Sequence, residues 1–283
     1  MTLKTIDHIF SHNSALTLHT WLPEKPKGIL FYIHGLQSHG GWLFETGEQL
    51  AKLSIAVYAL DRRGSGLSEG ARGDVINHKI LLGDYALALN LIRNRHANLP
   101  LALLGQSLGG SILAGLITHP SYETVFDKAI FLSPALGQNH HRLTNEELYN
   151  HKKNTKKEKI PTNLNDNDYT ENLRFLKFIK DDPLCLREIT CRSKAAFIQI
   201  EDLYWNKKKI FPKETSTILI HPKTDPIIHT ESALNTFCSL TGGNSSVLEI
   251  PTNKHYIEFS SQRSKLWECL TSYILKNNSV LIK

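Results

Sequence analysis

Short apolar runs alternate with longer amphipathic stretches along most of the chain. Runs that are almost wholly apolar, too short for helices and closed by glycine, proline or a polar residue predict buried strands at 27–33, 55–60, 99–104 and 128–133. Further strands are predicted at 215–221 and 245–250, and a leading hairpin at 5–11 and 16–21. Helical spacing predicts helices at 42–53, 77–95, 111–118 and 260–275. Strand alternating with helix indicates an α/β protein whose mostly parallel sheet is flanked by helices.

The alternation breaks between residues 136 and 213. This segment holds a basic run at 150–159, a polar run at 161–168 and spacing that predicts helices near 171–180 and 186–205. The pattern therefore divides the chain into a core of residues 1–135 and 214–283 and a mainly helical insertion of residues 136–213.

Composition fits a globular chain: of 283 residues, 41% are hydrophobic and 21% are charged. No stretch approaches the ~18 consecutive apolar residues of a membrane span. The first residues lack the apolar centre of a signal peptide, which predicts a cytoplasmic protein. The cysteines fit no metal-ligand spacing and are expected to be free thiols: Cys185, Cys191, Cys238 and Cys269.

Nearly all the excess positive charge falls in the insertion. Residues 136–213 contain sixteen Lys and Arg against eleven Asp and Glu, an excess of five in a chain whose net charge is +6. No basic helix with interleaved aromatic residues occurs, so nucleic-acid binding is not expected. A solvated basic face is one interpretation. The other is attraction to acidic lipid substrates or an anionic membrane surface through Lys152, Lys153, Lys156, Lys157 and Lys159.

A G-x-S-x-G pattern, Gly105-Gln-Ser-Leu-Gly109, stands between a predicted strand and a predicted helix. A serine on a strained strand-to-helix turn needs flanking residues without side chains, so that its hydroxyl projects over the edge of the sheet. The helix N-terminus behind it offers N–H groups to a developing oxyanion. The context predicts that Ser107 is a nucleophile; the alternative is a tight turn whose serine only caps the helix.

Two more loops follow buried strands. His34-Gly-Leu-Gln-Ser-His-Gly-Gly41 can bring backbone close to a ligand, and its Leu36 N–H, paired with that of Leu108, is the predicted oxyanion hole. The alternative is a flexible loop, and its two histidines are expected to be structural. The loop Asp61-Arg-Arg-Gly-Ser-Gly-Leu-Ser68 is expected to be cross-braced by an ion pair of its own rather than to be catalytic.

These three loops, in this order and after these strands, resemble the α/β-hydrolase fold. More narrowly, the chain resembles the monoacylglycerol lipase and lysophospholipase branch of the S33-like serine hydrolases. The resemblance implies that residues 136–213 form a cap over the active site, that the substrate is a single-chain lipid ester, and that no cofactor or metal is needed. Two positions depart from the family's usual pattern: Gln106, where His is frequent, and Gln37-Ser-His39, where Gly-Glu-His is frequent. Both flank the region expected to set the head-group preference.

In this fold the catalytic acid and base follow the nucleophile, the acid after one late strand and the base after the last. Asp225 and His255 stand at those positions. His221 and His229 precede the last strand, and Glu258 follows the predicted base. The alternative is that Asp225 only ends a turn and that His255 is an exposed loop residue.

The resulting prediction is a cofactor-free serine hydrolase with the triad Ser107, Asp225 and His255, acting on a monoacylglycerol or a lysophospholipid. A thioesterase would use the same triad. A prolyl-aminopeptidase-like enzyme would share the 61–68 loop but needs acidic residues for a free amine. A non-catalytic binding protein on the same scaffold is the alternative from another class.

Overall fold

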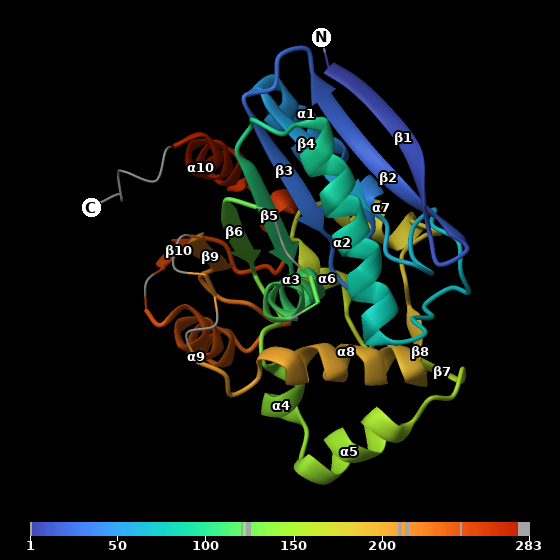
Figure 1. Cartoon of the computed structure of the whole chain (residues 1–283). Coiled ribbons are helices and arrows are strands. Elements are labelled where there is room, and N and C mark those ends of the chain that lie inside the picture. The colour runs from blue at the N-terminus through green and yellow to red at the C-terminus, as the bar shows by residue number, and fades with distance from the viewer. Residues whose placement is uncertain are drawn as a thin grey trace.

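The computed structural model describes residues 2–119, 121–122, 126–208, 211–212, 215–243 and 245–276. At its centre lies an eight-stranded sheet in the order β1-β2-β4-β3-β5-β6-β9-β10 (Figure 1). The strands are β1 (Thr2–Ser11), β2 (Ser14–Pro23), β3 (Gly28–Ile33), β4 (Ile55–Leu60), β5 (Leu101–Gln106), β6 (Lys128–Leu132), β9 (Ser216–Pro222) and β10 (Ser246–Ile250). β2 pairs antiparallel with β1 and β4, and all other neighbours are parallel. The predicted α/β class and the leading hairpin are confirmed.

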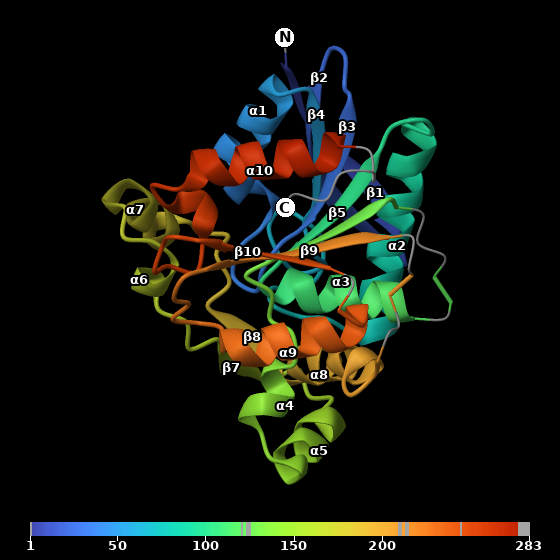
Figure 2. The ribbon, with the colours of Figure 1, turned by 90° about the vertical axis from the view of Figure 1, so that its left-hand side faces the viewer.

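Helices cover both faces of the sheet. Those of the core are η1 (Gly40–Leu43), α1 (Phe44–Lys52), α2 (His78–Arg95), α3 (Leu108–Thr118), α9 (Thr230–Thr241), η2 (Ile257–Phe259) and α10 (Arg263–Leu275). Leu30 and Tyr32 of β3 pack with α1 and α10, whereas Phe31 and Ile33 pack with the α2 and α3 side (Figure 2). β3 is therefore buried along its whole length. In the described part of the chain, no helix combines the length and apolarity needed to cross a membrane.

The predicted boundaries around Ser107 are wrong by a few residues. β5 extends to Gln106, and α3 begins at Leu108 rather than at residue 111. Gly109 and Gly110, which suggested a loop, lie inside α3. Because they have no side chain, the helix can approach its neighbours closely. A Cβ on Gly109 would lie 1.9 Å from the Ile33 carbonyl oxygen, and one on Gly110 would lie 2.5 Å from Pro134. Helix α9 is not predicted by the hydrophobic pattern.

The chain between β6 and β9 forms the insertion. Its elements are α4 (Gln138–Arg142), α5 (Asn145–Lys153), β7 (Lys159–Pro161), α6 (Asp166–Tyr169), α7 (Leu173–Asp181), β8 (Glu188–Thr190) and α8 (Cys191–Tyr204). The helix predicted at 186–205 begins later, because residues 188–190 pair antiparallel with β7 and Thr190 then caps α8. In Figure 1, α4 and α5 lie at the end of the molecule farthest from the β1–β2 hairpin.

The basic cluster of the insertion is partly neutralised by nearby carboxylates. Lys152 lies 2.9 Å from Asp202, and Lys159 lies 3.8 Å from Glu188. Pairing of this kind favours the solvated-face interpretation for those two side chains. Attraction of the cluster to an anionic membrane stays a prediction.

The loop after β4 is braced by partners outside it, so the expected ion pair within residues 61–68 is wrong. Asp61 accepts hydrogen bonds from the Gly40 N–H at 2.6 Å and bonds to His19 at 3.0 Å. Arg63 instead pairs with Asp84 of α2 at 2.9 Å. The carboxylate and the guanidinium thus tie the loop to two different elements, which fixes it against both β2 and α2.

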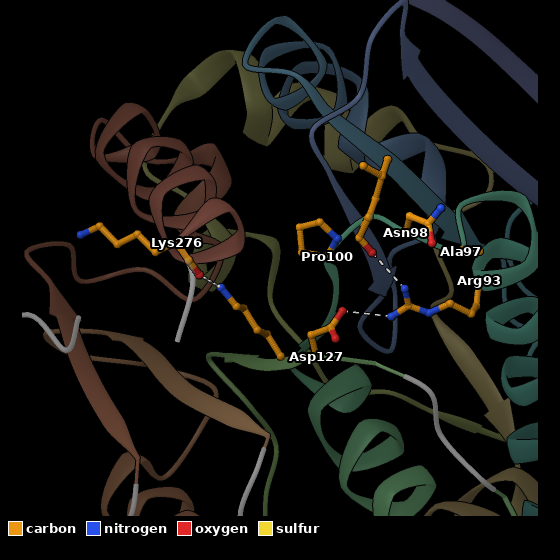
Figure 3. A pocket seen from close by; sticks show the side chains of 8 residues that line it. Arg93, Ala97, Asn98, Pro100, Asp127 and Lys276 are labelled. Atoms are coloured by element: carbon orange, nitrogen blue, oxygen red, sulfur yellow. Dashed lines mark hydrogen bonds and ion pairs between the residues drawn. The ribbon is translucent and has the colours of Figure 1, made fainter. Parts of the chain in front are cut away.

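A cavity of about 320 Å³ lies at the amino ends of β5 and β6 (Figure 3). Arg93 donates to Asp127 at 3.0 Å and to the Leu99 carbonyl at 2.9 Å. Lys128 donates to the Tyr273 and Ile274 carbonyls, at the C-terminal end of α10, where a cation is favoured. These polar groups bond to one another, which indicates a structural role.

We predict that Asp84→Ala lowers the free energy of unfolding by ~3–5 kcal/mol, because it leaves the buried Arg63 guanidinium without its carboxylate. Urea denaturation measures the change. The matched control is Asp181→Ala, which removes an exposed partner of Lys177 and should barely move the midpoint. Equal midpoint shifts for the two variants would contradict the prediction.

Candidate active site

Ser107 occupies a strained turn between β5 and α3. Its φ of 53° and ψ of −121° lie where residues with a side chain are rare, at a cost of order 1–3 kcal/mol. Its N–H donates to the Leu132 carbonyl at 3.0 Å, and its carbonyl accepts from the Ala135 N–H at 2.8 Å. A Cβ on Gly105 would lie 2.4 Å from the Gly109 carbonyl oxygen, so the turn closes only with glycine there. The strained turn predicted from the glycine spacing is confirmed.

Asp225 and His255 are brought together from loops after β9 and β10. Asp225 Oδ2 lies 2.8 Å from His255 Nδ1, and both side chains are buried. Asp225 Oδ1 accepts from the N–H groups of Ile227 and Ile228, each at 2.9 Å. Burial alone would raise the pKa of Asp225, but His255 and these two N–H groups hold it below its ordinary value. The carboxylate is therefore ionised and faces one ring nitrogen of His255.

The other ring nitrogen of His255 contacts Gln106, a partner that the sequence reasoning missed. Gln106 Nε2 lies 3.2 Å from His255 Nε2, and both side chains are buried. Since the amide nitrogen can only donate, this Nε2 is an acceptor and the ring proton sits on Nδ1, facing Asp225. The departure at Gln106 was visible in the sequence, but its contact with a residue 149 positions away was not.

The insertion holds the His255 loop through its backbone. The His255 N–H donates to the Asp168 carbonyl and the Tyr256 N–H donates to the Tyr169 carbonyl, both at 3.0 Å. The Tyr169 ring also meets the imidazole edge-on, with ring centres 5.8 Å apart. Helix α6 thus fixes the position of the imidazole, a contact that no pattern in the sequence predicts.

Leu36 and Leu108 line the same cavity as Ser107. Arg62 donates to the Gly35 carbonyl at 3.0 Å and to the Leu36 carbonyl at 2.7 Å. In a trans peptide the N–H points opposite to the preceding carbonyl, so the Leu36 N–H points away from Arg62. The Leu108 N–H belongs to the first residue of α3 and has no partner within the helix.

His34 is structural, as expected from the sequence. Its Nδ1 lies 2.8 Å from the Gly35 carbonyl, and its Nε2 accepts from the Arg62 N–H at 2.9 Å. Burial, together with the Arg62 charge, lowers the pKa of His34 to about 3. The ring is therefore neutral and fixes the 34–41 loop, which follows β3, against the loop after β4.

The cavity beside Ser107 has a volume of about 350 Å³. It lies between the carboxyl ends of the central strands and the insertion, where ligands bind in open α/β sheets. Much of its lining is apolar: Leu36, Leu108, Leu143, Ile160, Leu164, Ile189, Phe197, Ile227 and Ile228. Such a lining suits an aliphatic chain.

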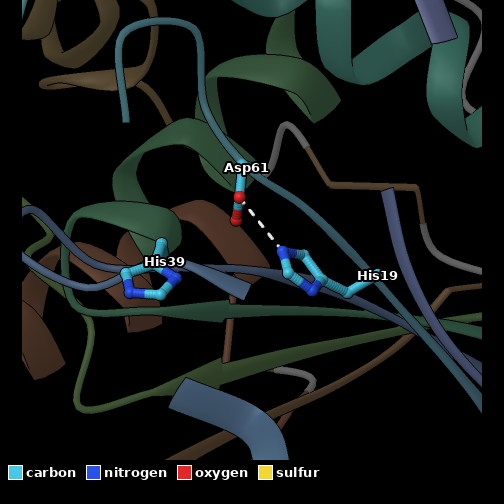
Figure 4. Close-up of side chains that lie close together, drawn as sticks. All are labelled: His19, His39 and Asp61. Atoms are coloured by element: carbon cyan, nitrogen blue, oxygen red, sulfur yellow. Dashed lines mark hydrogen bonds and ion pairs between the residues drawn. The ribbon is translucent and has the colours of Figure 1, made fainter. Parts of the chain in front are cut away.

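A second group of side chains, His19, His39 and Asp61, lies close enough to suggest a metal site (Figure 4). The side-chain atoms that could bind a metal already make hydrogen bonds within the protein. His39 accepts from the Gly41 N–H and bonds to Asp182 at 3.0 Å, while Asp61 bonds to His19 and two backbone N–H groups. These contacts fit a structural network that joins β2, the 34–41 loop and the insertion. The four cysteines are free thiols, as predicted.

Glu258 lies close to His255 in sequence but bonds elsewhere: it accepts from the Tyr32 hydroxyl. Burial raises the pKa of Glu258 from 4.5 to about 6, although the bond from Tyr32 opposes the rise. Between these values the folded protein binds more protons than the unfolded chain, so stability falls as pH rises.

We predict that Glu258→Gln removes this dependence. Relative to the variant, the wild type should lose about 2 kcal/mol of unfolding free energy between pH 4.5 and pH 7. Urea denaturation at the two pH values measures it. A constant difference between the proteins at both pH values would show that Glu258 titrates normally.

Comparison with known proteins places these features in a family context. A family model described as serine aminopeptidase, S33 (Hydrolase_4) matches residues 24–260. The monoglyceride lipase of Rattus norvegicus is 32% identical over 117 residues, which cover 41% of this chain and 38% of that protein. The monoacylglycerol lipase of Mycolicibacterium smegmatis is 32% identical over 94 residues, 33% of this chain and 34% of that protein. The matched part thus spans about a third of these relatives.

Solved structures match over nearly the whole chain. A soluble variant of monoglyceride lipase from Saccharomyces cerevisiae, in complex with a substrate analog, superposes with a TM-score of 0.82 and 16% identity, covering 97% of this chain and 96% of that one. A carboxyl esterase from Bacillus coagulans, in complex with glycerol, gives 0.81 and 18%, covering 98% and 100%. These likenesses show that the chain has the α/β-hydrolase fold.

Proposed function

The chain belongs to the serine aminopeptidase S33 family, and on that premise we propose that it hydrolyses carboxylic esters through an acyl-enzyme on Ser107. One observation carries the proposal. A serine on a strained turn opens onto the cavity, and its neighbour Gln106 contacts the imidazole that Asp225 orients. This combination supplies a nucleophile, a base and a group that holds the base in the required tautomer.

In the proposed reaction, His255 Nε2 takes the proton from Ser107 Oγ as Oγ attacks the ester carbonyl carbon. In this step His255 Nε2 exchanges the hydrogen bond that it accepts from the Gln106 amide for one from the Ser107 hydroxyl. The exchange is needed because its single lone pair accepts only one of these hydrogen bonds. Asp225 stabilises the imidazolium that forms. The alcohol leaves with the proton of His255, and water, deprotonated by the same nitrogen, then releases the carboxylic acid and restores Ser107.

The N–H groups of Leu36 and Leu108 would stabilise the oxyanion of each tetrahedral intermediate. Both residues line the cavity beside Ser107. The orientation of the Leu36 peptide by Arg62 is fixed before substrate binds, so no reorganisation is needed during the reaction. A donor of this kind is worth ~3 kcal/mol of transition-state stabilisation.

We further propose a single-chain lipid ester, a monoacylglycerol or a lysophospholipid, as the substrate. The apolar cavity lining supports an aliphatic acyl chain, and relatives named monoglyceride lipase share the family. Among the described residues that line the cavity, none is Asp or Glu. That composition disfavours the aminopeptidase alternative, which needs a carboxylate for a free amine.

We predict that Ser107→Ala abolishes covalent labelling by a fluorophosphonate and nearly all ester hydrolysis, since the attacking oxygen is gone. Labelling is read by mass spectrometry. Ser133→Ala is the matched control, because Ser133 also has a positive φ at the end of a strand. Labelling of another serine in the wild type would rule out Ser107 as the nucleophile.

A second prediction concerns Asp225→Asn, which keeps the size of the side chain but favours the wrong imidazole tautomer. The loss in kcat should be on the order of 10⁴, the effect of that change in the serine-protease template. Asp127→Asn, at the opposite edge of the sheet, is the control and should retain full activity. Activity of Asp225→Asn within a few-fold of wild type would mean that another carboxylate orients the base.

A further inference from the structure

The cavity beside Ser107 contains two cationic side chains within its largely apolar lining. Arg142, at the end of α4, and Lys194, in the first half of α8, both line it. His151 of α5 lines it as well. Arg142 and Lys194 come from two elements of the insertion, so their positive charge is gathered by the fold and not by a run in the sequence.

Neither cation has a carboxylate partner within 4.0 Å among the residues that the structure describes. Lys194 Nζ donates to the Asn139 side-chain carbonyl at 2.6 Å. Arg142 donates to the Ile227 carbonyl and to Gln138 Oε1, the latter at 3.3 Å. These acceptors are neutral, and lysine has three N–H donors and arginine five. Both side chains therefore keep donors for a ligand.

The nearby carboxylate of Glu201 is committed elsewhere. It is fully buried and accepts from the N–H groups of Asn139 and His140, from the Asn139 amide and, at 2.7 Å, from His140 Nδ1. It does not line the cavity. Burial lowers the pKa of Lys194, Glu201 opposes this, and Arg142 adds to it. The Glu201 carboxylate thus lies near Lys194, but the hydrogen bonds that it accepts come from Asn139 and His140 and not from the Lys194 ammonium.

We propose that Arg142 and Lys194 bind an anionic group, a carboxylate or a phosphate, on the ester that Ser107 attacks. The inference rests on the proposed function and narrows its substrate class to acidic esters. The half-buried Lys194 ammonium is stabilised when it is paired, and the Arg142 guanidinium matches the oxygens of carboxylate and phosphate. The anion occupies the polar part of the cavity, while the apolar lining takes the acyl chain.

The negative charge can stand on either side of the scissile bond, and two substrate pairs distinguish these sources. Lysophosphatidic acid against a monoacylglycerol of the same acyl chain tests the alcohol side. The p-nitrophenyl monoester of glutaric acid against p-nitrophenyl valerate tests the acyl side, since the two acyl chains have the same length. The measured quantity is the ratio of kcat/KM for the anionic and the neutral member of each pair.

Lys194→Gln and Arg142→Gln should each lower this ratio by ~10-fold or more for at least one pair, the loss expected for a charged hydrogen bond. Lys194→Arg should restore it. Lys180→Gln, which removes an exposed lysine of α7 outside the cavity, should leave every rate unchanged. Arg142 is exposed and its substitution leaves the core intact, so it carries the test if Lys194→Gln does not fold.

Binding to the Ser107→Ala protein separates this inference from the proposed function. For at least one of the two substrate pairs, calorimetry should give tighter binding of the anionic member than of the neutral member, and Lys194→Gln or Arg142→Gln should remove the difference. If the wild type hydrolyses no ester but this binding difference is found, the proposed hydrolase activity is contradicted and the proposed anion site is supported. Unchanged ratios and unchanged binding differences in both glutamine variants would overturn the anion site and leave the hydrolase.

Discussion

The close approach of α3 to β3 is the constraint on which the site depends. Gly109 packs against the Ile33 carbonyl with no room for a Cβ, and Gly105 likewise leaves no room for one against Gly109. This approach forces Ser107 into its positive φ, because the chain must reverse between the end of β5 and the start of α3. The strain is held by hydrogen bonds from both sides of the serine backbone. It also sets the first turn of α3 beside the loop that follows β3.

Around this turn, buried polar side chains hold neighbouring loops together by hydrogen bonds. Arg62 donates to two carbonyls of the 34–41 loop, and the neutral His34 ring accepts from the Arg62 N–H. Asp61 accepts from N–H groups of two loops. Each of these groups would be costly to bury alone. Together they satisfy one another, so the loops at the carboxyl edge of the sheet form one rigid unit.

The insertion completes the site as well as covering it. Asp182 accepts from His39 and, at 2.7 Å, from the Trp42 indole, and Gln37 donates to Thr162 at 2.7 Å. The backbone bonds from His255 and Tyr256 to α6 form a further connection. Substitutions in the insertion can therefore shift the His255 imidazole and the 34–41 loop without contacting a ligand in the cavity. The same segment supplies the two cationic side chains that line the cavity, Arg142 and Lys194.

The sequence by itself determined most of the fold and the positions of the candidate triad. Buried strands appear as apolar runs because helices cover both faces of the sheet, and glycine at 105 and 109 marks a turn that only glycine permits. Asp225 and His255 could be selected as candidates because each follows a predicted strand. A strand of this kind is recognised from the local sequence alone. The candidate roles of these residues follow from that order.

Only the tertiary structure decided which side chains meet across the site. The contact of Gln106 with His255, the pairing of β7 with β8 that shortens α8, and the placement of Arg142 and Lys194 in one cavity all join distant parts of the chain. The loop after β4 shows the same limit: adjacent Asp and Arg suggested a local ion pair, yet their partners are His19 and Asp84. Hydrophobic periodicity and turn chemistry report each residue's own environment, whereas a polar contact depends on where the fold places both partners.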